Sequence, residues 1–242
     1  MKVLAMVPAR GGSKAVPDKN LRPLAGRTLI ERTVECARLS GVLDRVVLST
    51  DSPAIADLGR RVGLEVPFLR PPDLARDDSG MMEVALHTVS ELAADGYTAD
   101  AFMVLQPTSP LRKPEHIQQA VELLAGNSRS DAVCSVCPMP KDVCPHYLVK
   151  VVDGWMDFFM PDGARYTRRQ DVPQAWRRDG TIFLTRTSVL LEQRSFYGRR
   201  CLTLELSPDD VLNINETHEW EEAERRLTAT SSSFVAAATF SK

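Results

Sequence analysis

The 242-residue sequence lacks any long apolar run and any strong excess of charge of one sign. No apolar run approaches the ~18 residues that a transmembrane helix needs, and the N-terminus lacks the charged, apolar and small-residue regions of a secretory signal. Thirty basic against 32 acidic residues leave a net charge of −2, so no overall field attracts nucleic acid or a membrane surface. We therefore expect a cytoplasmic protein that binds neither nucleic acid nor membrane.

Cysteine is also scarce, and its pattern argues against a disulfide framework. The five cysteines are odd in number and scattered along the chain. Cys134 and Cys137 have the spacing of a metal or redox site, but they lie in a predicted strand, where residues three apart point to opposite faces. The four histidines are widely separated and form no ligand cluster. Buried thiols are the better interpretation.

Apolar runs alternate with amphipathic stretches through most of the chain. Helices are predicted at 28–40, 53–62, 80–95, 114–124 and 216–228, and strands at 2–8, 45–50, 101–106, 131–136, 181–186 and 201–206. Thr28 and Glu31 fit a capping box, and Ser52-Pro53 offers a cap followed by a first-turn proline. Unbroken Val/Ile/Leu strands separated by helices predict an α/β fold with three layers, α/β/α, around a mainly parallel, Rossmann-like sheet.

One segment, residues 139–175, departs from this alternation. It contains "HYLVKVVDGWMDFFM", in which Asp153-Gly154 is a strong hairpin signal, and then a polar, basic stretch. We interpret the whole chain, 1–242, as a single domain that carries this segment as an insertion. Exposed Trp155, Phe158 and Phe159 on an insertion are typical of a subunit interface, so we predict that residues 139–175 mediate a homodimer.

A basic loop, "VPARGGSKAVPDKN", directly follows the first predicted strand. Residues 10–27 hold five basic side chains against one acidic side chain. In an open parallel sheet, ligands bind beyond the carboxyl ends of the strands, where this loop lies. The paired Gly11 and Gly12 allow the backbone to approach a ligand closely and aim its amides inward, and Arg10, Lys14 and Lys19 add charge, so the loop suits a polyphosphate.

Two common phosphate-binding loops do not fit this stretch. A Walker loop ends in Gly-Lys-Ser/Thr, whereas the chain has Gly12-Ser13-Lys14-Ala15. A dinucleotide fingerprint needs G-x-G-x-x-G, and the glycines here stop at Gly12. The sequence therefore supports neither an ATPase nor a dehydrogenase.

These residues resemble the acylneuraminate cytidylyltransferases, the CMP-sialic acid synthetases and their bacterial nonulosonic acid relatives. The similarity covers almost the whole chain, because "PARGGSKAVPDKN", "DRVVLSTDS", "VPFLRPPDLARDD", "LQPTSPLR", "RRQDVPQAWRRDGTIFLT" and "INETHEWEEAE" occur in the family's order. KDO-activating enzymes resemble the chain less, since they lack the Gly-Gly-Ser-Lys and Lys-Asn elements. The resemblance implies a nucleotide-diphospho-sugar transferase fold and a nucleotidyltransferase of cell-surface polysaccharide biosynthesis that transfers CMP from CTP to the anomeric hydroxyl of a nine-carbon sugar acid, releasing pyrophosphate.

The resemblance also implies roles for particular residues. Positions that match the family's catalytic and nucleotide-binding residues are Arg10, Gly11, Gly12, Ser13, Lys14, Lys19, Asn20, Arg70 and Ser79. Among them Lys19 is expected on the α-phosphate, with Arg10 and Lys14 on the rest of the triphosphate, because phosphoryl transfer needs positive charge on the phosphates. Positions that match its sugar-binding residues are Gln106, Arg169, Arg177 and Phe183. Each has an alternative interpretation: Gln106 could simply cap a strand, the two arginines could be solvated or form salt bridges in a dimer, and Phe183, an alternating residue of "TIFLT", could equally be a core residue.

The chain departs from the family at its metal-binding motif. Many members carry Asp-Ile-Asp before the last helix, whereas this chain has Asn213-Ile214-Asn215. An asparagine offers one neutral carbonyl oxygen, so Asn213 and Asn215 should hold Mg²⁺ weakly, and the ion should arrive with CTP.

Three hypotheses follow from these residues. The first is the CTP-dependent synthetase. The second is a nucleotidyltransferase of the same fold that uses another sugar or base, such as a KDO-type or GTP-dependent enzyme, because base choice depends on few contacts. The third is a nucleotide-binding protein that has lost catalysis, for which the asparagine pair is the only hint.

Overall fold

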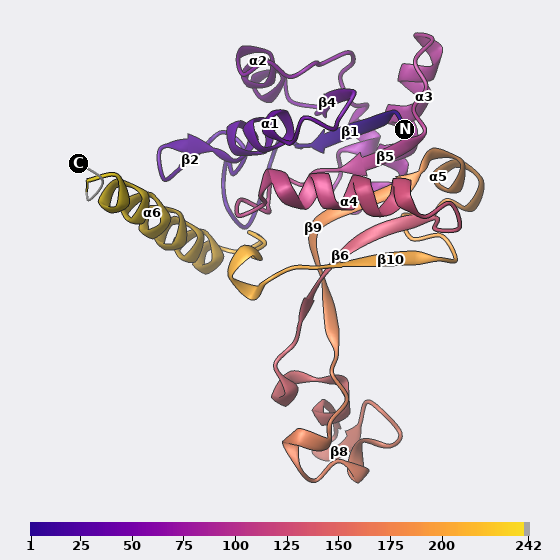
Figure 1. The fold of residues 1–242 in the computed structure, drawn as a ribbon, viewed down its shortest axis with the longest axis vertical. Helices are drawn as coiled ribbons and strands as arrows, with labels where there is room; N and C mark the ends of the chain where they lie inside the picture. The colour runs from indigo at the N-terminus through magenta and orange to yellow at the C-terminus, as the bar shows by residue number, and fades with distance from the viewer. Residues whose placement is uncertain (240–242) are drawn as a thin grey trace.

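The computed structural model describes residues 1–239, with side chains described for residues 1–229. Its centre is a six-stranded sheet in the order β10-β6-β9-β5-β1-β4 (Figure 1). The strands are β1 (Val3–Pro8), β4 (Arg45–Ser49), β5 (Ala101–Val104), β6 (Ala132–Pro138), β9 (Trp176–Arg186) and β10 (Cys201–Glu205). Neighbouring strands run parallel except at β9, which is antiparallel to both β5 and β6. The mainly parallel sheet predicted from the sequence is confirmed.

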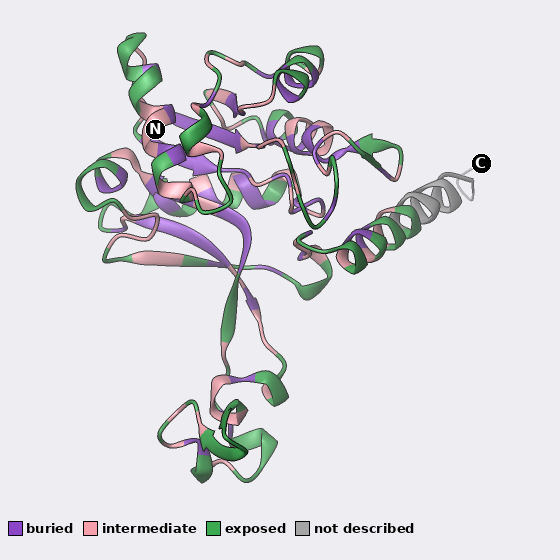
Figure 2. Ribbon diagram, turned by 180° about the vertical axis from the view of Figure 1, so that it is seen from behind, coloured by how far each residue is buried: buried purple, intermediate pink, exposed green. Residues whose placement is uncertain are grey.

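Helices cover both faces of this sheet, as the predicted three-layer arrangement requires. Residues 3, 5 and 7 of β1 join a hydrophobic cluster with side chains of α1, α2 and α4, whereas residues 4 and 6 join a second cluster with α3 and α5. Seen from behind, the sheet between the helices is mostly buried (Figure 2). The bounds are α1 (Leu29–Ser40), α2 (Pro53–Arg61), α3 (Met81–Ala94), α4 (Pro114–Gly126) and α5 (Thr187–Gln193).

Local sequence signals set the helix starts. The Thr28 hydroxyl accepts a hydrogen bond from the Glu31 amide while the Glu31 carboxylate accepts one from the Thr28 amide, which confirms the capping box. Ser52 caps α2, as predicted. The sequence did not predict the short hairpin of β2 (Pro23–Leu24) and β3 (Arg27–Thr28), nor α5. The last helix, α6 (Thr217–Thr239), extends beyond its predicted end at 228, and no helix in the described part of the chain could span a bilayer.

Two long strands, β6 and β9, connect the insertion to the body of the domain, and the insertion lies below that body in Figure 1. Its hairpin pairs β7 (Val149–Val152) with β8 (Trp155–Phe158), and Asp153 and Gly154 form the turn with positive φ values of 50° and 81°. Trp155 is 81% exposed and Phe159 54% exposed. The prediction that Phe158 is exposed is wrong, because its ring is half-buried against the backbone near Gly163.

The cysteines are free thiols. Cys134 and Cys137 are buried on β6, on either side of a register shift in the pairing with β9. Burial raises the pKa of Cys134 to about 12 and also raises that of Cys137, so neither is a ready thiolate. The described residues contain no group of three or more His, Cys, Asp or Glu side chains that could hold a metal ion.

Candidate active site

The basic loop lies where β1 ends, at the edge of the sheet expected to bind ligands. Val16 anchors it in a small hydrophobic cluster with Trp220 of α6. Gly12 has a φ of +66°, a conformation that favours glycine. The Gly11 amide differs from the expectation that it faces a phosphate, because it donates a hydrogen bond to Asp51 Oδ1 at 2.9 Å. That carboxylate fixes the backbone of the loop instead.

A cavity of about 210 Å³ opens beside this loop and brings together most of the predicted nucleotide-binding side chains. It reaches from the basic loop across to the segment that follows β5. The predicted residues in its wall are Arg10, Ser13, Lys19, Asn20, Arg70, Ser79 and Gln106. Segments separated by as many as 96 positions in sequence therefore converge on one site.

Lys19 lines the cavity, and its side chain is half-buried. Its Nζ donates a hydrogen bond to the backbone carbonyl of Ile214 at 3.0 Å. Burial lowers the pKa of Lys19 and the nearby Arg10 lowers it further, while Glu219 opposes the shift. A cation that is partly desolvated beside another cation gains most from an arriving anion. Lys19 therefore has the electrostatic character expected of a phosphate ligand.

Arg70 and its neighbours form a more rigid part of the wall. Arg70 is only 5% exposed, and its guanidinium donates to Ser49 Oγ at 3.1 Å and to the Ser49 carbonyl at 2.6 Å. Burial lowers its pKa to about 10, although Asp51 favours the charged form. The Asn20 amide donates to the Arg10 carbonyl at 3.2 Å, and the Ser79 hydroxyl donates to the Asp73 carbonyl at 2.9 Å. These bonds organise the cavity wall.

The sequence did not single out Asp77, which also lines the cavity. Its carboxylate forms an ion pair with Arg10 at 2.6 Å and a second ion pair with Lys14. These contacts lower the pKa of Asp77, the hydrogen bond from Lys14 most and that from Arg10 next. Sites for small molecules usually enclose about 300–1,000 Å³, more than the roughly 210 Å³ found here. Asp77 thus pairs with two of the cations that the sequence predicts to bind phosphate, and it lines the same small cavity.

Replacing Asp77 by asparagine is expected to tighten CTP binding. The substitution removes an anion that competes for Arg10 and Lys14, and exposed ion pairs of this kind are weak, so the Kd should fall only about 3- to 5-fold. Calorimetric titration with CTP measures the change. Asp78→Asn, which removes the same charge from the same loop, is the control. Weaker binding by Asp77→Asn would show that the carboxylate helps to hold the nucleotide.

Gln106 forms the far wall of the cavity, in the segment after β5. Its backbone carbonyl accepts a hydrogen bond from Arg112 Nη2 at 2.6 Å. Its side-chain oxygen and the side chain of Asn213 both lie close to Gly180 of β9. The Ile214 amide donates to the Thr108 carbonyl at 2.8 Å, which fixes the segment around Asn213 to the segment around Gln106.

Three of the predicted sugar-binding residues do not line this cavity. Arg169 lies in the insertion, where its side chain is 66% exposed and contacts Asp142 at 3.5 Å. Arg177 is exposed near the start of β9, opposite Cys137. Phe183 lies on β9 and packs in the hydrophobic cluster of α3 and α5, with its ring centre 6.2 Å from that of Phe196. Within one chain, Phe183 is therefore a half-buried residue that packs against the core.

The Asn213-Ile214-Asn215 segment fits a resident Mg²⁺ poorly. Asn213 Oδ1 is buried without a hydrogen-bond partner in the described structure, so it could supply one neutral oxygen. Asn215 is exposed, and its amide donates to Glu219 Oε2 at 2.6 Å. Asp210 pairs with Lys113 at 2.6 Å. Mg²⁺ prefers at least one charged carboxylate in a direct site, and the Asn213-Ile214-Asn215 segment supplies none.

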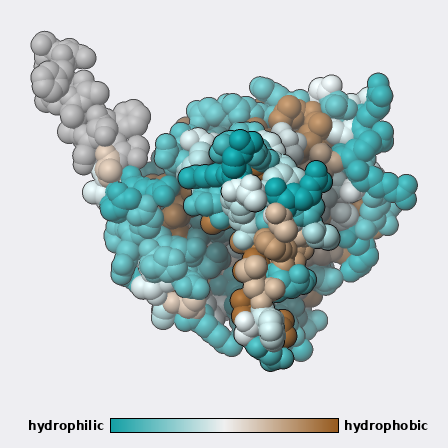
Figure 3. Space-filling view, turned by 90° about the horizontal axis from the view of Figure 1, so that it is seen from below, coloured by the Kyte–Doolittle hydropathy of each residue, from teal (hydrophilic) through white to brown (hydrophobic). Residues whose placement is uncertain are grey.

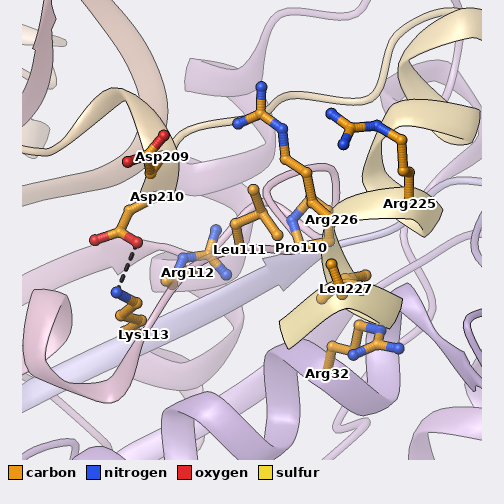
Figure 4. A pocket seen from close by; sticks show the side chains of 11 residues that line it. Arg32, Pro110, Leu111, Arg112, Lys113, Asp209, Asp210, Arg225, Arg226 and Leu227 are labelled. Atoms are coloured by element: carbon orange, nitrogen blue, oxygen red, sulfur yellow. Dashed lines mark ion pairs between the residues drawn. The ribbon is translucent and has the colours of Figure 1, made fainter. Parts of the chain in front are cut away.

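A second and larger cavity, of about 710 Å³, lies between α1, the loop before α4 and α6 (Figure 4). Its described lining includes no residue predicted for the site. Arginines dominate its wall, but they already have partners: Arg32 donates to the Leu24 and Ala25 carbonyls, while Arg225 and Arg226 both pair with Glu222. The smaller cavity therefore remains the better candidate for the active site.

Comparisons with known proteins show what the chain as a whole is similar to. The family model described as "Cytidylyltransferase" matches residues 4–211. The chain is 33% identical over 232 residues to the CMP-N,N'-diacetyllegionaminic acid synthase of Legionella pneumophila, covering 94% of this chain and 97% of that protein. It is 31% identical over 223 residues to the N-acylneuraminate cytidylyltransferase of Escherichia coli O18:K1:H7, covering 91% of this chain and about half, 51%, of that protein.

Solved structures agree on the fold. A CMP:2-keto-3-deoxy-manno-octonic acid synthetase complexed with CTP superposes with a TM-score of 0.72 over 96% of this chain and 100% of that chain, at 17% identity. At this identity the likeness shows a shared fold alone. The family model matched over residues 4–211, together with the 33% identical relative that covers 94% of this chain, shows that the chain belongs to the cytidylyltransferase family.

Proposed function

We propose that the protein transfers CMP from CTP to the anomeric hydroxyl of a nonulosonic sugar acid and releases pyrophosphate. The observation that carries this proposal is the convergence of Arg10, Lys19, Arg70 and Gln106 on one cavity at the carboxyl edge of the sheet. The relatives support the substrate class, since one is named for diacetyllegionaminic acid and another for acylneuraminate.

The charges of the loop suit the bond that must break. The sugar hydroxyl attacks the α-phosphorus, and the bond from that phosphorus to the bridging oxygen of the pyrophosphate breaks, so negative charge grows on the leaving group. Arg10 and Lys14, once Asp77 is displaced, would bind the β- and γ-phosphates, and Lys19 would stabilise the α-phosphate. Fixed positive charge in a partly desolvated site supplies this stabilisation without reorganisation of water.

Mg²⁺ is part of the proposal as a companion of CTP. The neutral amide oxygens of Asn213 and Asn215 should bind Mg²⁺ only weakly in the absence of nucleotide. When bound, Mg²⁺ neutralises phosphate charge. We assign no step to a protein-bound metal, because the Asn213-Ile214-Asn215 segment does not fit one.

The same proposal includes a homodimer formed through the insertion. Figure 3 looks at the insertion from below and shows a strip of hydrophobic side chains across it. The strongly exposed apolar residues there are Val151, Val152, Trp155, Met156 and Phe159. An apolar patch of this kind on an extended insertion is typical of a protein interface. A dimer interface would remove these apolar side chains from water.

A dimer would also explain where Arg169 acts. The insertion lies apart from the body of its own chain (Figure 1), so the exposed guanidinium is poorly placed for its own cavity. In the proposed dimer the insertion of one protomer would instead extend to the cavity of its partner, where the planar guanidinium of Arg169 would bind the carboxylate of the sugar acid at two points. CTP and the sugar acid would then meet at a site built from two chains, in the cytoplasm where CTP is made.

A panel of acceptors tests the proposed function. Purified protein is incubated with CTP, Mg²⁺ and sialic, legionaminic, pseudaminic or KDO-type acids, and pyrophosphate is measured. We expect release only when CTP and a nine-carbon acid are both present, and not with GTP, ATP or UTP. Release with another base or with KDO alone would favour a different nucleotidyltransferase. CTP binding without release for any acid would indicate a protein that has lost catalysis.

A further inference from the structure

We propose that Gly180 is a positioning residue that sets the orientation of Gln106 toward the acceptor sugar, with Arg112 as its partner in holding the Gln106 segment. This inference rests on the proposed transfer to a sugar acid. It concerns β9, the antiparallel strand beside β5, and it explains why a glycine stands in the middle of a strand. A glycine in a strand often marks the close approach of another group.

Gly180 has both a special backbone and crowded surroundings. Its φ is +81°, and a Cβ added there would lie 2.8 Å from Asn213 Nδ2 and 3.2 Å from Gln106 Oε1. Real Cβ atoms essentially never approach within 3.0 Å of another atom. Two amide side chains from distant segments therefore use the space that any other residue would fill. The Gln106 amide can stand at the cavity wall because position 180 has no side chain.

Hydrogen bonds also join β9 to the segment that carries Gln106. The Ser109 hydroxyl donates to the Gly180 carbonyl at 3.3 Å. The Arg112 guanidinium is buried, and it donates through Nε to the Thr181 carbonyl at 2.9 Å and through Nη2 to the Gln106 carbonyl at 2.6 Å. One rigid side chain thus joins β9 to the Gln106 segment. A side chain added at position 180, or removal of the Arg112 guanidinium, should therefore move Gln106 relative to the phosphate site.

Asn213 and Ile214 connect the surroundings of Gly180 to Lys19, the residue proposed to bind the α-phosphate. Asn213 precedes Ile214, whose carbonyl accepts the hydrogen bond from Lys19 and whose amide donates to Thr108. A side chain at position 180 would press on Asn213 and Gln106 first, and would reach Lys19 only through the backbone of Ile214. We therefore expect acceptor binding to suffer more than CTP binding.

The test compares Gly180→Ala with Gly96→Ala. Gly96 has a φ of +80°, nearly that of Gly180, but an added Cβ there meets nothing within 4 Å. Both variants carry the same backbone strain, and only Gly180→Ala adds the collision. Misplacement of a substrate-positioning group by about 1 Å can cost up to about 100-fold, so we expect the KM for the acceptor to rise about tenfold or more in Gly180→Ala, with the Kd for CTP within about twofold of wild type. Gly96→Ala should behave as wild type in both respects.

A second variant keeps the test decisive if Gly180→Ala loses activity altogether. Asn213→Ala removes the side chain that the new Cβ would strike first. Because residues in contact couple, the double variant Gly180→Ala/Asn213→Ala should lose less acceptor affinity than the sum of the two single variants. Additive losses, or a Gly180→Ala enzyme that matches Gly96→Ala, would overturn the inference. Failure of the proposed function would look different, since wild-type protein would then release no pyrophosphate with any acid.

Discussion

Replacing Lys19 by methionine is expected to lower kcat about a hundredfold. Loss of one fixed group that stabilises developing charge typically costs about 10²- to 10³-fold, and Lys19 is a partly desolvated cation in the cavity wall, bonded to the Ile214 carbonyl. Methionine keeps the apolar stem and the packing while it removes the charge. Steady-state pyrophosphate release with saturating CTP and acceptor measures the effect.

Lys2→Met is the matched control, because Lys2 is exposed at the opposite end of β1 from the basic loop. Its kcat should equal that of wild type. The melting temperature of both variants should be recorded, so that a loss of fold is not read as a loss of catalysis. A kcat for Lys19→Met within a few-fold of wild type, in a folded protein, would remove Lys19 from the proposed role.

Replacing Arg169 by alanine is expected to raise the KM for the sugar acid about 10- to 100-fold while the KM for CTP stays nearly constant. The range follows from losing a charge-assisted hydrogen bond worth about 1.5–3 kcal/mol. Arg168→Ala is the control, since this neighbouring arginine pairs with Asp171 on the insertion. Equal increases in both KM values for Arg169→Ala would contradict the carboxylate assignment.

Mixing two impaired proteins tests whether Arg169 acts across the dimer. Arg169→Ala and Lys19→Met proteins each lack one necessary group in both of their sites. If the insertion serves the partner, a mixed dimer contains one intact site, and an equimolar mixture should recover about a quarter of wild-type activity at low acceptor concentration. No recovery, after subunit exchange has been verified, would place Arg169 at the site of its own chain or away from both.

The layers of the fold could be predicted because local signals and periodicity agree with the final structure. Thr28 and Glu31 marked the start of α1, and the unbroken apolar strands indicated a covered sheet. The antiparallel direction of β9 could not be read in the same way, because it depends on where the chain returns after the insertion. The hairpin of β2 and β3 was missed since its strands are only two residues long each.

The candidate site was predictable to a similar extent. Side chains on the basic loop and at strand ends converge, because parallel strands bring their carboxyl ends to one edge. Asp77 was missed although it lies in the motif "VPFLRPPDLARDD", since no local rule says that a carboxylate will fold back onto Arg10 and Lys14. Gly180 was missed for another reason: its importance lies in the side chains of Gln106 and Asn213, which come from two other segments.

A crystal structure of the protein with CTP is the most direct test of the central claim that the cavity beside β1 binds the nucleotide. We predict that the triphosphate contacts Arg10, Lys14 and Lys19, that Asp77 has left the two cations it pairs with in this structure, and that the cytosine lies toward Arg70 and Ser79. A nucleotide bound instead in the larger arginine-lined cavity of Figure 4, or a basic loop left empty at saturating CTP, would contradict the account.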